Sequence, residues 1–263
     1  MTQIASPQNP RLKALRRLHT RRERARTGSF LAEGEDLIAA ARAAGRAPLE
    51  GYRLAGAQLD AARLGCGAFH EVDRAALASV CALGQGSRVI AAYEQRWSAA
   101  PAGPLCVYLH GVGDPGNVGT VLRSAHAFGA SCVALGPGCA DPHSPKAVRA
   151  SMGAIFAVAL ARAGSVVDLP GERVALLADA PEPLRGDADA RRAGEDGAGG
   201  RRAGGDSITL LVGAERDGLP AEVVAACERT ARIPIASESL NAAMAATVAL
   251  YEMTREPSRV PAA

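Results

Sequence analysis

An arginine on a predicted helix, with small residues beside it, forms the first pattern in the chain that is suited to chemistry. Residues 110–130 read HGVGDPGNVGTVLRSAHAFGA, which leaves an apolar strand, turns at Asp-Pro-Gly and enters a helix over 117–128. Arg123 supplies a fixed positive charge there, and small residues (Gly116, Gly119, Thr120) on a neighbouring stripe leave room for a substrate. This arrangement suits a substrate-binding position, although a lone mid-helix arginine also fits a plain surface position.

Two further segments place polar groups where open α/β folds bind ligands. LLVGAERDGLP (210–220) is a strand that runs into a glycine-bounded turn, so Gly213 permits close approach to the backbone and Glu215 places a carboxylate at the sheet edge. RIPIASESLNAAMAATVALYE (232–252) reads as a short strand, a polar loop and a helix whose opening turn carries Ser239 and Asn241. Backbone amides point outward at a helix start, so this polar cluster is a candidate binding site.

Other patterns in the same region do not support rival chemistries. Gly111, Gly113 and Gly116 spell GxGxxG, but the next strand (SCVALGPG) ends without the acidic residue of a dinucleotide site, which disfavours a nicotinamide-dependent oxidoreductase. His110 and His126 are rival bases by type, and we expect them to be structural. The six cysteines lack CxxC spacing and predict small buried side chains rather than a metal site or disulfides.

Alternating strands and helices position these segments. Strands are predicted at 105–112, 132–136, 155–160, 174–178 and 208–212, and helices at 117–128 and 144–152, which indicates a mostly parallel sheet covered by helices. Residues 182–206, rich in glycine and charge, predict a disordered insertion. With 263 residues, two domains are expected: 1–98 as a small α/β domain, 99–104 as a linker and 105–263 as the second domain.

The first domain carries a basic run. Helices are predicted from Asn9 to Leu18 and from Glu33 to Ala44. The net charge is only +3, but basic side chains concentrate in residues 11–26, which is typical of a phosphate-binding face or of a solvated helix. The candidate RNA-binding residues are Arg11, Lys13, Arg16, Arg17, Arg21 and Arg22. The sequence has no membrane-span pattern and no apolar leader, so a cytoplasmic protein is expected.

Taken in order, DPGNVGTVLRSA, LVGAERDGLP and RIPIASESLNAAMAATVALYE resemble the three motifs of the SpoU-like (TrmH-like) RNA 2′-O-ribose methyltransferases of the SPOUT superfamily. The N-terminal segment also resembles the RNA substrate-binding domain that often precedes this catalytic domain. The resemblance covers about 104–255 and implies an α/β SPOUT domain whose sheet carries a trefoil knot, a rare exception among folds. It further implies an S-adenosylmethionine cofactor, a homodimer and no metal.

The resemblance also implies residue roles. Arg123, Asn117, Glu215, Ser239 and Asn241 match the catalytic and polar site residues. Gly213, Ile233 and Leu240 match the cofactor-binding positions, although the loop from Ile233 to Leu240 is about two residues shorter than the common family form.

The implied reaction is methylation of a ribose 2′-hydroxyl in structured RNA, with ribosomal RNA favoured over transfer RNA. Arg123 acts either as the base or as an electrostatic stabiliser of the developing oxyanion, and the sequence leaves both open. A non-catalytic RNA-binding or ribosome-assembly protein, and base methylation by another SPOUT branch, are the alternative interpretations.

Overall fold

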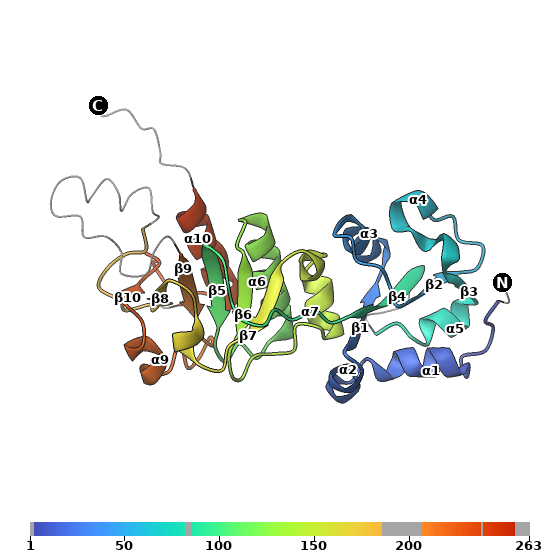
Figure 1. Ribbon diagram of the computed structural model, residues 1–263, viewed down its shortest axis with the longest axis horizontal. Helices are drawn as coiled ribbons and strands as arrows, with labels where there is room; N and C mark the ends of the chain where they lie inside the picture. Colours follow the sequence, from blue (N-terminus) through green and yellow to red (C-terminus); the bar gives the residue numbers. More distant parts are fainter. Residues whose placement is uncertain (1–2, 83–85, 186–206, 238, 256–263) are drawn as a thin grey trace, which may run out of the picture. The chain divides into compact units, whose positions relative to one another are not determined.

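The computed structural model describes residues 3–82, 86–185, 207–237 and 239–255 (Figure 1). The chain divides into two compact units, and each is described by itself. Unit 1 contains the chain up to Arg96, Asp114–Arg123 and Ala140–Ala157, and unit 2 contains Trp97–Gly113, Ser124–Cys139 and the chain from Val158 onward.

Unit 1 contains a four-stranded mixed sheet in the order β1-β4-β2-β3. The strands are β1 (Ser29–Glu33), β2 (Glu50–Leu54), β3 (His70–Val72) and β4 (Val89–Glu94). β4 pairs antiparallel with both β1 and β2, and β3 pairs parallel with β2. The helix predicted from Glu33 begins only at Glu35, because Glu33 still pairs in β1 and Gly34 turns the chain with φ +102°.

Short helices cover this sheet. They are α1 (Pro10–Arg17), α2 (Arg21–Thr27), α3 (Glu35–Ala43), α4 (Ala61–Leu64), α5 (Arg74–Ala78) and α7 (Pro145–Ala150), with 3₁₀ turns at Cys66–Ala68 and Ala154–Phe156. The prediction of α1 is confirmed: the Asn9 side chain caps it by accepting from the Arg11 amide at 2.9 Å, and Leu12 and Leu15 are buried.

One arginine of the basic run points inward. Arg24 is 3% exposed and donates from Nε and Nη2 to one carboxylate oxygen of Asp141 at 2.9 and 2.7 Å. Its Nη1 donates to the carbonyls of Leu18 and His19, each at 2.8 Å. A buried charge that is paired and hydrogen-bonded in this way belongs to the architecture, so Arg24 is not part of a phosphate-binding face.

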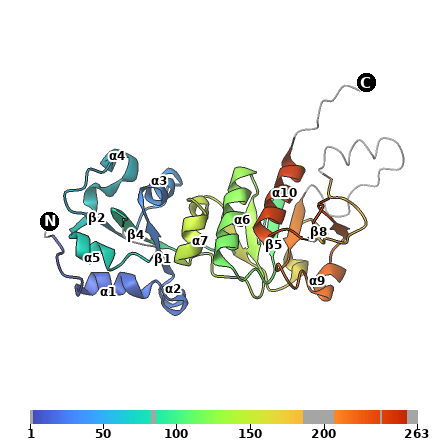
Figure 2. The same ribbon diagram turned by 180° about the vertical axis from the view of Figure 1, so that it is seen from behind.

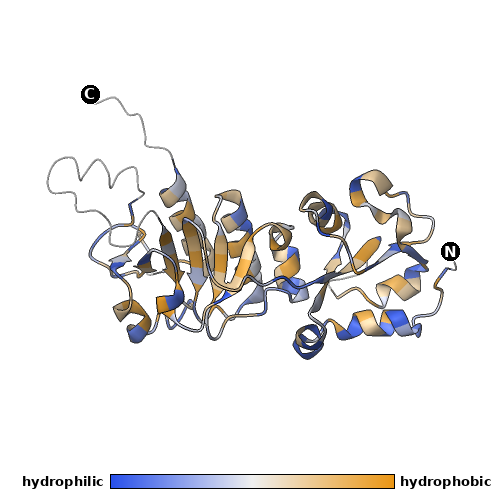
Figure 3. Ribbon diagram, in the orientation of Figure 1, coloured by the Kyte–Doolittle hydropathy of each residue, from blue (hydrophilic) through white to orange (hydrophobic). Residues whose placement is uncertain are grey.

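Unit 2 is built on a six-stranded sheet in the order β10-β8-β9-β5-β6-β7, and all its pairs are parallel, as the sequence predicts. The strands are β5 (Leu105–Leu109), β6 (Cys132–Leu135), β7 (Ala159–Arg162), β8 (Glu172–Leu176), β9 (Ile208–Val212) and β10 (Arg229–Ala231). The central strands β5, β6 and β9 are apolar throughout most of their length, as Figure 3 shows.

Two strand predictions are wrong. Residues 155–160 do not form one strand: the backbone turns at Met152 (φ 48°) and Gly153 (φ 94°), Ala154–Phe156 is a 3₁₀ turn, and the strand begins at Ala159. The strand predicted from Arg232 instead occupies 229–231 as β10, since Arg229, Thr230 and Ala231 pair with β8.

Three helices and one 3₁₀ turn accompany this sheet in the described residues: α6 (Pro115–Ala127), which spans the boundary between the units, α9 (Ala221–Ala225), α10 (Ala242–Thr254) and the turn Val166–Asp168. α10 lies against β9, and Figure 2 shows α10 in front of the sheet. Ser124 Oγ in the last turns of α6 meets Thr247 Oγ1 at 2.6 Å. Within the part of the chain that the structure describes, no helix is long and apolar enough to cross a membrane.

The predicted insertion at 182–206 lies outside the described residues, except for its first four. Of those, Pro183 forms a bridge with Arg232, the Leu184 amide donates to the Arg232 carbonyl at 2.8 Å, and Leu184 is buried. All six cysteines are free thiols, and Cys66, Cys106 and Cys132 are buried as the sequence predicts.

An ion pair between Arg173 in β8 and Glu228 before β10 makes the sheet edge sensitive to acid. Glu228 also accepts from the Arg173 amide at 2.7 Å, and the hydrogen bond from the Arg173 guanidinium lowers the pKa of Glu228 to about 2. A carboxylate whose pKa is lower in the folded than in the unfolded protein stabilises the fold at a pH above its pKa in the unfolded protein. This stabilisation is lost as the pH falls toward its pKa in the folded protein.

We therefore expect Glu228→Gln to unfold at lower urea near neutral pH, by no more than about 1 kcal/mol because the pair is partly exposed. The gap to wild type should shrink below about pH 4.5. Urea titrations across this range test the expectation, and a gap that stays constant with pH would show that the carboxylate charge is not responsible.

Candidate cofactor and catalytic site

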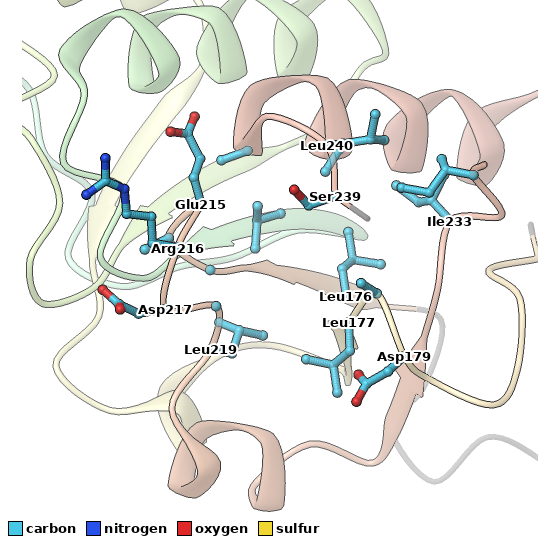
Figure 4. A pocket seen from close by; sticks show the side chains of 18 residues that line it. Leu176, Leu177, Asp179, Glu215, Arg216, Asp217, Leu219, Ile233, Ser239 and Leu240 are labelled. Atoms are coloured by element: carbon cyan, nitrogen blue, oxygen red, sulfur yellow. The ribbon is translucent and has the colours of Figure 1, made fainter. Parts of the chain in front are cut away.

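A pocket of about 400 Å³ lies in unit 2 where β8 and β9 end. The carboxyl edge of a parallel sheet is where open α/β folds bind ligands, and the volume falls within the range of small-molecule sites. Figure 4 shows Glu215, Arg216 and Asp217 on one side of the pocket and Leu176 and Ile233 on the other.

The lining of this pocket suits a ligand that is part apolar and part cationic. Leu176, Leu177, Leu219, Ile233, Ile235 and Leu240 supply apolar walls. Three carboxylates, Asp179, Glu215 and Asp217, face one guanidinium, Arg216, so the lining side chains carry net negative charge. RNA phosphates are repelled by such a lining, whereas a sulfonium or an ammonium group is attracted to it.

The turn after β9 shapes one wall of the pocket. The Ala214 amide donates to the Gly218 carbonyl at 3.2 Å, and the Gly218 amide donates back to the Ala214 carbonyl at 2.9 Å, with φ +64° at Gly218. A Cβ at Gly213 would collide with the Gly218 backbone and lie 2.5 Å from the Leu219 amide nitrogen. The space that a side chain at position 213 would occupy is therefore taken by the chain's own backbone. Gly213 also lines the pocket.

One hydrogen bond joins the second and third motifs. Asn241 Nδ2 donates to Glu215 Oε1 at 2.5 Å, while Asn241 Oδ1 accepts from the amides of Ala243 and Met244 at 3.0 and 3.4 Å. The same side chain thus caps α10 and holds the turn after β9. Ser239 is exposed and lines the pocket, so the structure brings together Glu215, Ser239 and Asn241 with the predicted cofactor positions.

Sequence reasoning missed the segment Leu176–Asp179, which lines the pocket from the end of β8. A strand was predicted at 174–178, but nothing in the sequence states that it pairs with a strand more than thirty residues later. The pairing of β8 with β9 would have revealed this segment. Because the two strands are parallel neighbours, Asp179 and Glu215 follow strand ends that lie side by side at the same edge of the sheet.

The first motif begins α6. Asp114 Oδ1 accepts the Asn117 amide at 3.0 Å, and Asp114 Oδ2 accepts from Lys146 Nζ at 2.6 Å. The hydrogen bond from Lys146 holds the pKa of Asp114 below its ordinary value, so this carboxylate stays charged at the helix start. Arg123 is exposed and forms no ion pair with the described part of the chain, while Asn117 is half-buried.

The glycines of the first motif make room for α7 and for their own loop rather than for a substrate. A Cβ at Gly119 would overlap the Ala147 carbonyl and lie 2.7 Å from Ala150 Cβ. A Cβ at Gly116 would lie 2.7 Å from Asp114 Oδ1 and 3.2 Å from Lys146 Cε. The first turn of α6 is therefore packed directly on α7, which carries Lys146.

For the methyl transfer that the sequence resemblance implies, replacing Lys146 by methionine is expected to lower turnover by about tenfold, because it frees the loop that orients Asn117. Cofactor affinity should not change, since no pocket residue is altered. Lys146→Arg, which keeps a donor for Asp114, should recover most of the turnover. Single-turnover rates and cofactor titrations separate the effects, and an equal loss of cofactor binding would point to general unfolding instead.

The remaining candidates are placed as follows. His110 Nδ1 lies 3.0 Å from the Tyr108 hydroxyl, and His126 is exposed. The side chains of Lys13, Arg17, Arg21 and Arg22 are exposed. Arg16 donates to Ser79 Oγ at 3.0 Å and to the Pro7 carbonyl at 2.7 Å, whereas Arg11 contacts Glu50 and His70.

With this geometry established, comparison with known proteins defines the class. Residues 104–251 match the model of the SpoU rRNA Methylase family, and residues 9–91 match an MRM3-like substrate binding domain. The chain therefore belongs to the SpoU rRNA methylase family. It is 32% identical to an uncharacterized tRNA/rRNA methyltransferase of Synechocystis over 96% of this chain and 93% of that protein.

Two further relatives connect the family to a reaction and a cofactor. The 23S rRNA (guanosine(2553)-2′-O)-methyltransferase RlmP of Bacillus subtilis is 28% identical over 96% of this chain and 99% of its own. An rRNA methyltransferase from Sinorhizobium meliloti, solved with AdoMet bound, superposes with a TM-score of 0.77 at 30% identity and covers 95% of this chain and 96% of its own. S-adenosylmethionine is accordingly the cofactor of this class.

Proposed function

We propose that the protein transfers a methyl group from S-adenosylmethionine to a ribose 2′-hydroxyl in ribosomal RNA. The observation that carries the proposal is the pocket at the ends of β8 and β9, whose apolar walls and net negative lining complement a cationic nucleoside cofactor. Membership of the SpoU family and the 23S rRNA ribose methyltransferase among the relatives support the substrate class.

The pocket residues hold the cofactor in this proposal. Leu176, Ile233 and Leu240 pack against its apolar part, and the carboxylates at the rim favour its positive charge. When bound, the cofactor supplies an electrophilic methyl group on a sulfonium. The Asn241–Glu215 hydrogen bond fixes the two loops that line the pocket, so the cofactor is positioned without reorganising them.

Arg123 acts at the reacting hydroxyl. A ribose hydroxyl is a poor acid, so its oxygen needs stabilisation as it loses its proton to solvent and attacks. The Arg123 guanidinium is exposed and has no carboxylate partner among the described residues, so its charge is not neutralised internally. A guanidinium keeps its proton in neutral water, which favours the stabilising role over the base. Asn117, held at the helix start by Asp114, is the second polar group that the first motif contributes, and Ser239 is a polar group of the pocket lining.

Residues 1–98 bind the RNA in this proposal, through a basic surface on Arg11, Lys13, Arg17, Arg21 and Arg22, and residues 105–263 carry the reaction. The match of 9–91 to a substrate binding domain supports this division. We also propose that the catalytic domain contains the trefoil knot of the family and that the protein works in the cytoplasm, where ribosomal RNA is modified.

A homodimer is part of the proposal. Met244, Val248 and Tyr251 are 61%, 41% and 55% exposed and recur every three or four residues, so they form one apolar stripe on α10. A stripe of large exposed apolar side chains favours association, and a second copy of the chain would cover it. Sedimentation of the wild type beside Tyr251→Glu tests this point.

The reaction is tested by incubating the protein with labelled S-adenosylmethionine and unmodified ribosomal or transfer RNA, and then analysing the nucleosides. A 2′-O-methylated nucleoside from ribosomal RNA is the expected product. The same nucleoside from transfer RNA alone would change the substrate class, and a methylated base would assign the protein to other chemistry. RNA binding without any transfer would instead support a non-catalytic assembly protein.

A further inference from the structure

A second hollow of about 580 Å³ lies on unit 1, far in sequence from the cofactor pocket. It follows α1 and α2 on one side and meets residues at the ends of sheet strands on the other. Its lining is Arg11, Ala14, Leu15, Arg17, Leu18, Glu23, Arg26, Thr27, Ser29, Leu49, Glu50, His70 and Ala92. We call this hollow the α1 groove.

One end of the α1 groove carries a fixed set of hydrogen-bonding groups. Arg11 Nη1 donates to His70 Nε2 at 2.6 Å and lies 3.3 Å from Glu50 Oε1, and His70 Nε2 is 3.5 Å from the same carboxylate oxygen. The side chains of Arg11 and Glu50 are 54% and 34% exposed. A carboxylate acceptor and a guanidinium donor therefore stand side by side, oriented by mutual contacts and open to solvent.

The other end of the α1 groove is cationic. Arg17 lies six residues after Arg11 on the same helix, a rise of about 9 Å, and Arg26 faces the groove from α2. Arg26 pairs with Glu23 at 2.6 Å, but its own side chain is 66% exposed, and pairs on the surface contribute little to stability. The lining of the groove thus offers guanidinium groups for an anion together with the hydrogen-bonding set of Arg11, Glu50 and His70.

The lining of the α1 groove also includes a large exposed apolar side chain. Leu49 is 61% exposed, although unit 1 buries most of its large apolar residues. Ala14 and Ala92 extend the same surface. An apolar strip between a cationic end and a hydrogen-bonding end is suited to the flat face of an unstacked base.

We propose that the α1 groove binds a single unstacked nucleotide of the RNA substrate, distinct from the nucleotide that is methylated. Its phosphate is held by Arg17 and Arg26, its base lies on Leu49, and the base edge meets Glu50 and Arg11. The base that fits best is guanine, because its adjacent N–H donors complement the Glu50 carboxylate and its carbonyl oxygen accepts from Arg11. Uracil, with one N–H between two carbonyls, fits worst.

This inference rests on the proposed function only for the identity of the ligand as RNA. An acidic peptide is the competing occupant, but it has no flat group for the apolar strip and no donors for Glu50. The exposed basic side chains of Lys13, Arg21 and Arg22 on the same two helices extend the positive charge beyond the groove, as a polynucleotide requires.

The first test is crosslinking of the full-length protein to a short single-stranded RNA that contains one 6-thioguanosine. S-adenosylhomocysteine is added at saturation so that the cofactor pocket is blocked. We expect adducts on the peptides that contain 11–18 or 49–50. Adducts confined to unit 2, or equal competition by a glutamate-rich peptide, would overturn the proposal.

The second test uses matched variants. Leu49→Asp should weaken binding of the same RNA by about tenfold or more, which is ~1.4 kcal/mol, whereas Val167→Asp makes the same change at a site on unit 2 that is 68% exposed and should have no effect. Glu50→Gln should reduce the preference for guanosine over uridine RNA, with overall affinity for mixed-sequence RNA largely retained.

The readouts separate this proposal from the proposed function. Normal methyl transfer, with RNA affinity unchanged by Leu49→Asp and the preference for guanosine unchanged by Glu50→Gln, would remove the nucleotide site but leave the methyltransferase assignment intact. If Leu49→Asp weakens RNA binding and Glu50→Gln loses the guanosine preference, but the wild type transfers no methyl group, the nucleotide site stands and the reaction is removed.

Discussion

Replacing Arg123 by alanine is expected to lower methyl transfer by at least about 100-fold, because loss of one group that stabilises a developing oxyanion costs two to three orders of magnitude. S-adenosylmethionine affinity should stay close to wild type, since Arg123 does not line the pocket. The fold should also be preserved, because Arg123 is exposed and has no ion-pair partner among the described residues. Single-turnover transfer to ribosomal RNA and cofactor titration measure the two effects.

Two matched variants on and beside the same position sharpen this test. His126→Ala, three residues further along α6, removes an exposed rival base and should leave transfer unchanged. Arg123→Lys keeps the positive charge, so a stabilising role predicts partial activity that does not increase with pH. Activity of Arg123→Lys that rises steadily with pH would favour proton abstraction by residue 123, and equal loss of transfer and cofactor binding in Arg123→Ala would contradict both roles.

Elements with strong local signals were predictable from the sequence. The observed strand Ile208–Val212 begins and ends at the predicted residues. A short, uninterrupted apolar run before a glycine turn is typical of a buried strand in an α/β chain. α1 was found from the spacing of Leu12, Leu15 and Leu18. The second and third motifs located Glu215, Ser239 and Asn241; in the structure Glu215 and Ser239 line one pocket, and Asn241 is hydrogen-bonded to Glu215.

Features that depend on distant partners were not predictable. Gly119 and Gly213 signal that something approaches the backbone, but the sequence does not say whether it is a ligand or the chain, and in both cases it is the chain. Arg24 reads like the other arginines of the basic run until Asp141, more than a hundred residues later, is seen to hold it. Asp179 could be assigned to the pocket only after β8 was placed beside β9.

Replacing Asn241 by alanine is expected to weaken S-adenosylmethionine binding by about 10- to 100-fold and to destabilise the protein by about 2 kcal/mol. One part of the loss is the cap of α10, which is worth about 1 kcal/mol. The other is the hydrogen bond to the Glu215 carboxylate, which is charge-assisted and therefore stronger than a neutral one. Calorimetric titration of the cofactor and urea unfolding give the two quantities.

Asn241→Ser separates the two roles, because a serine hydroxyl also caps a helix but is too short to reach Glu215. If the contact between the two motifs shapes the pocket, Asn241→Ser should unfold like wild type yet bind the cofactor nearly as poorly as Asn241→Ala. Glu215→Gln keeps an acceptor for Asn241 Nδ2 and should bind better than Glu215→Ala. Wild-type cofactor affinity in Asn241→Ser would show that Asn241 matters only as a helix cap, and that the turn after β9 and the segment before α10 keep their positions without its hydrogen bond to Glu215.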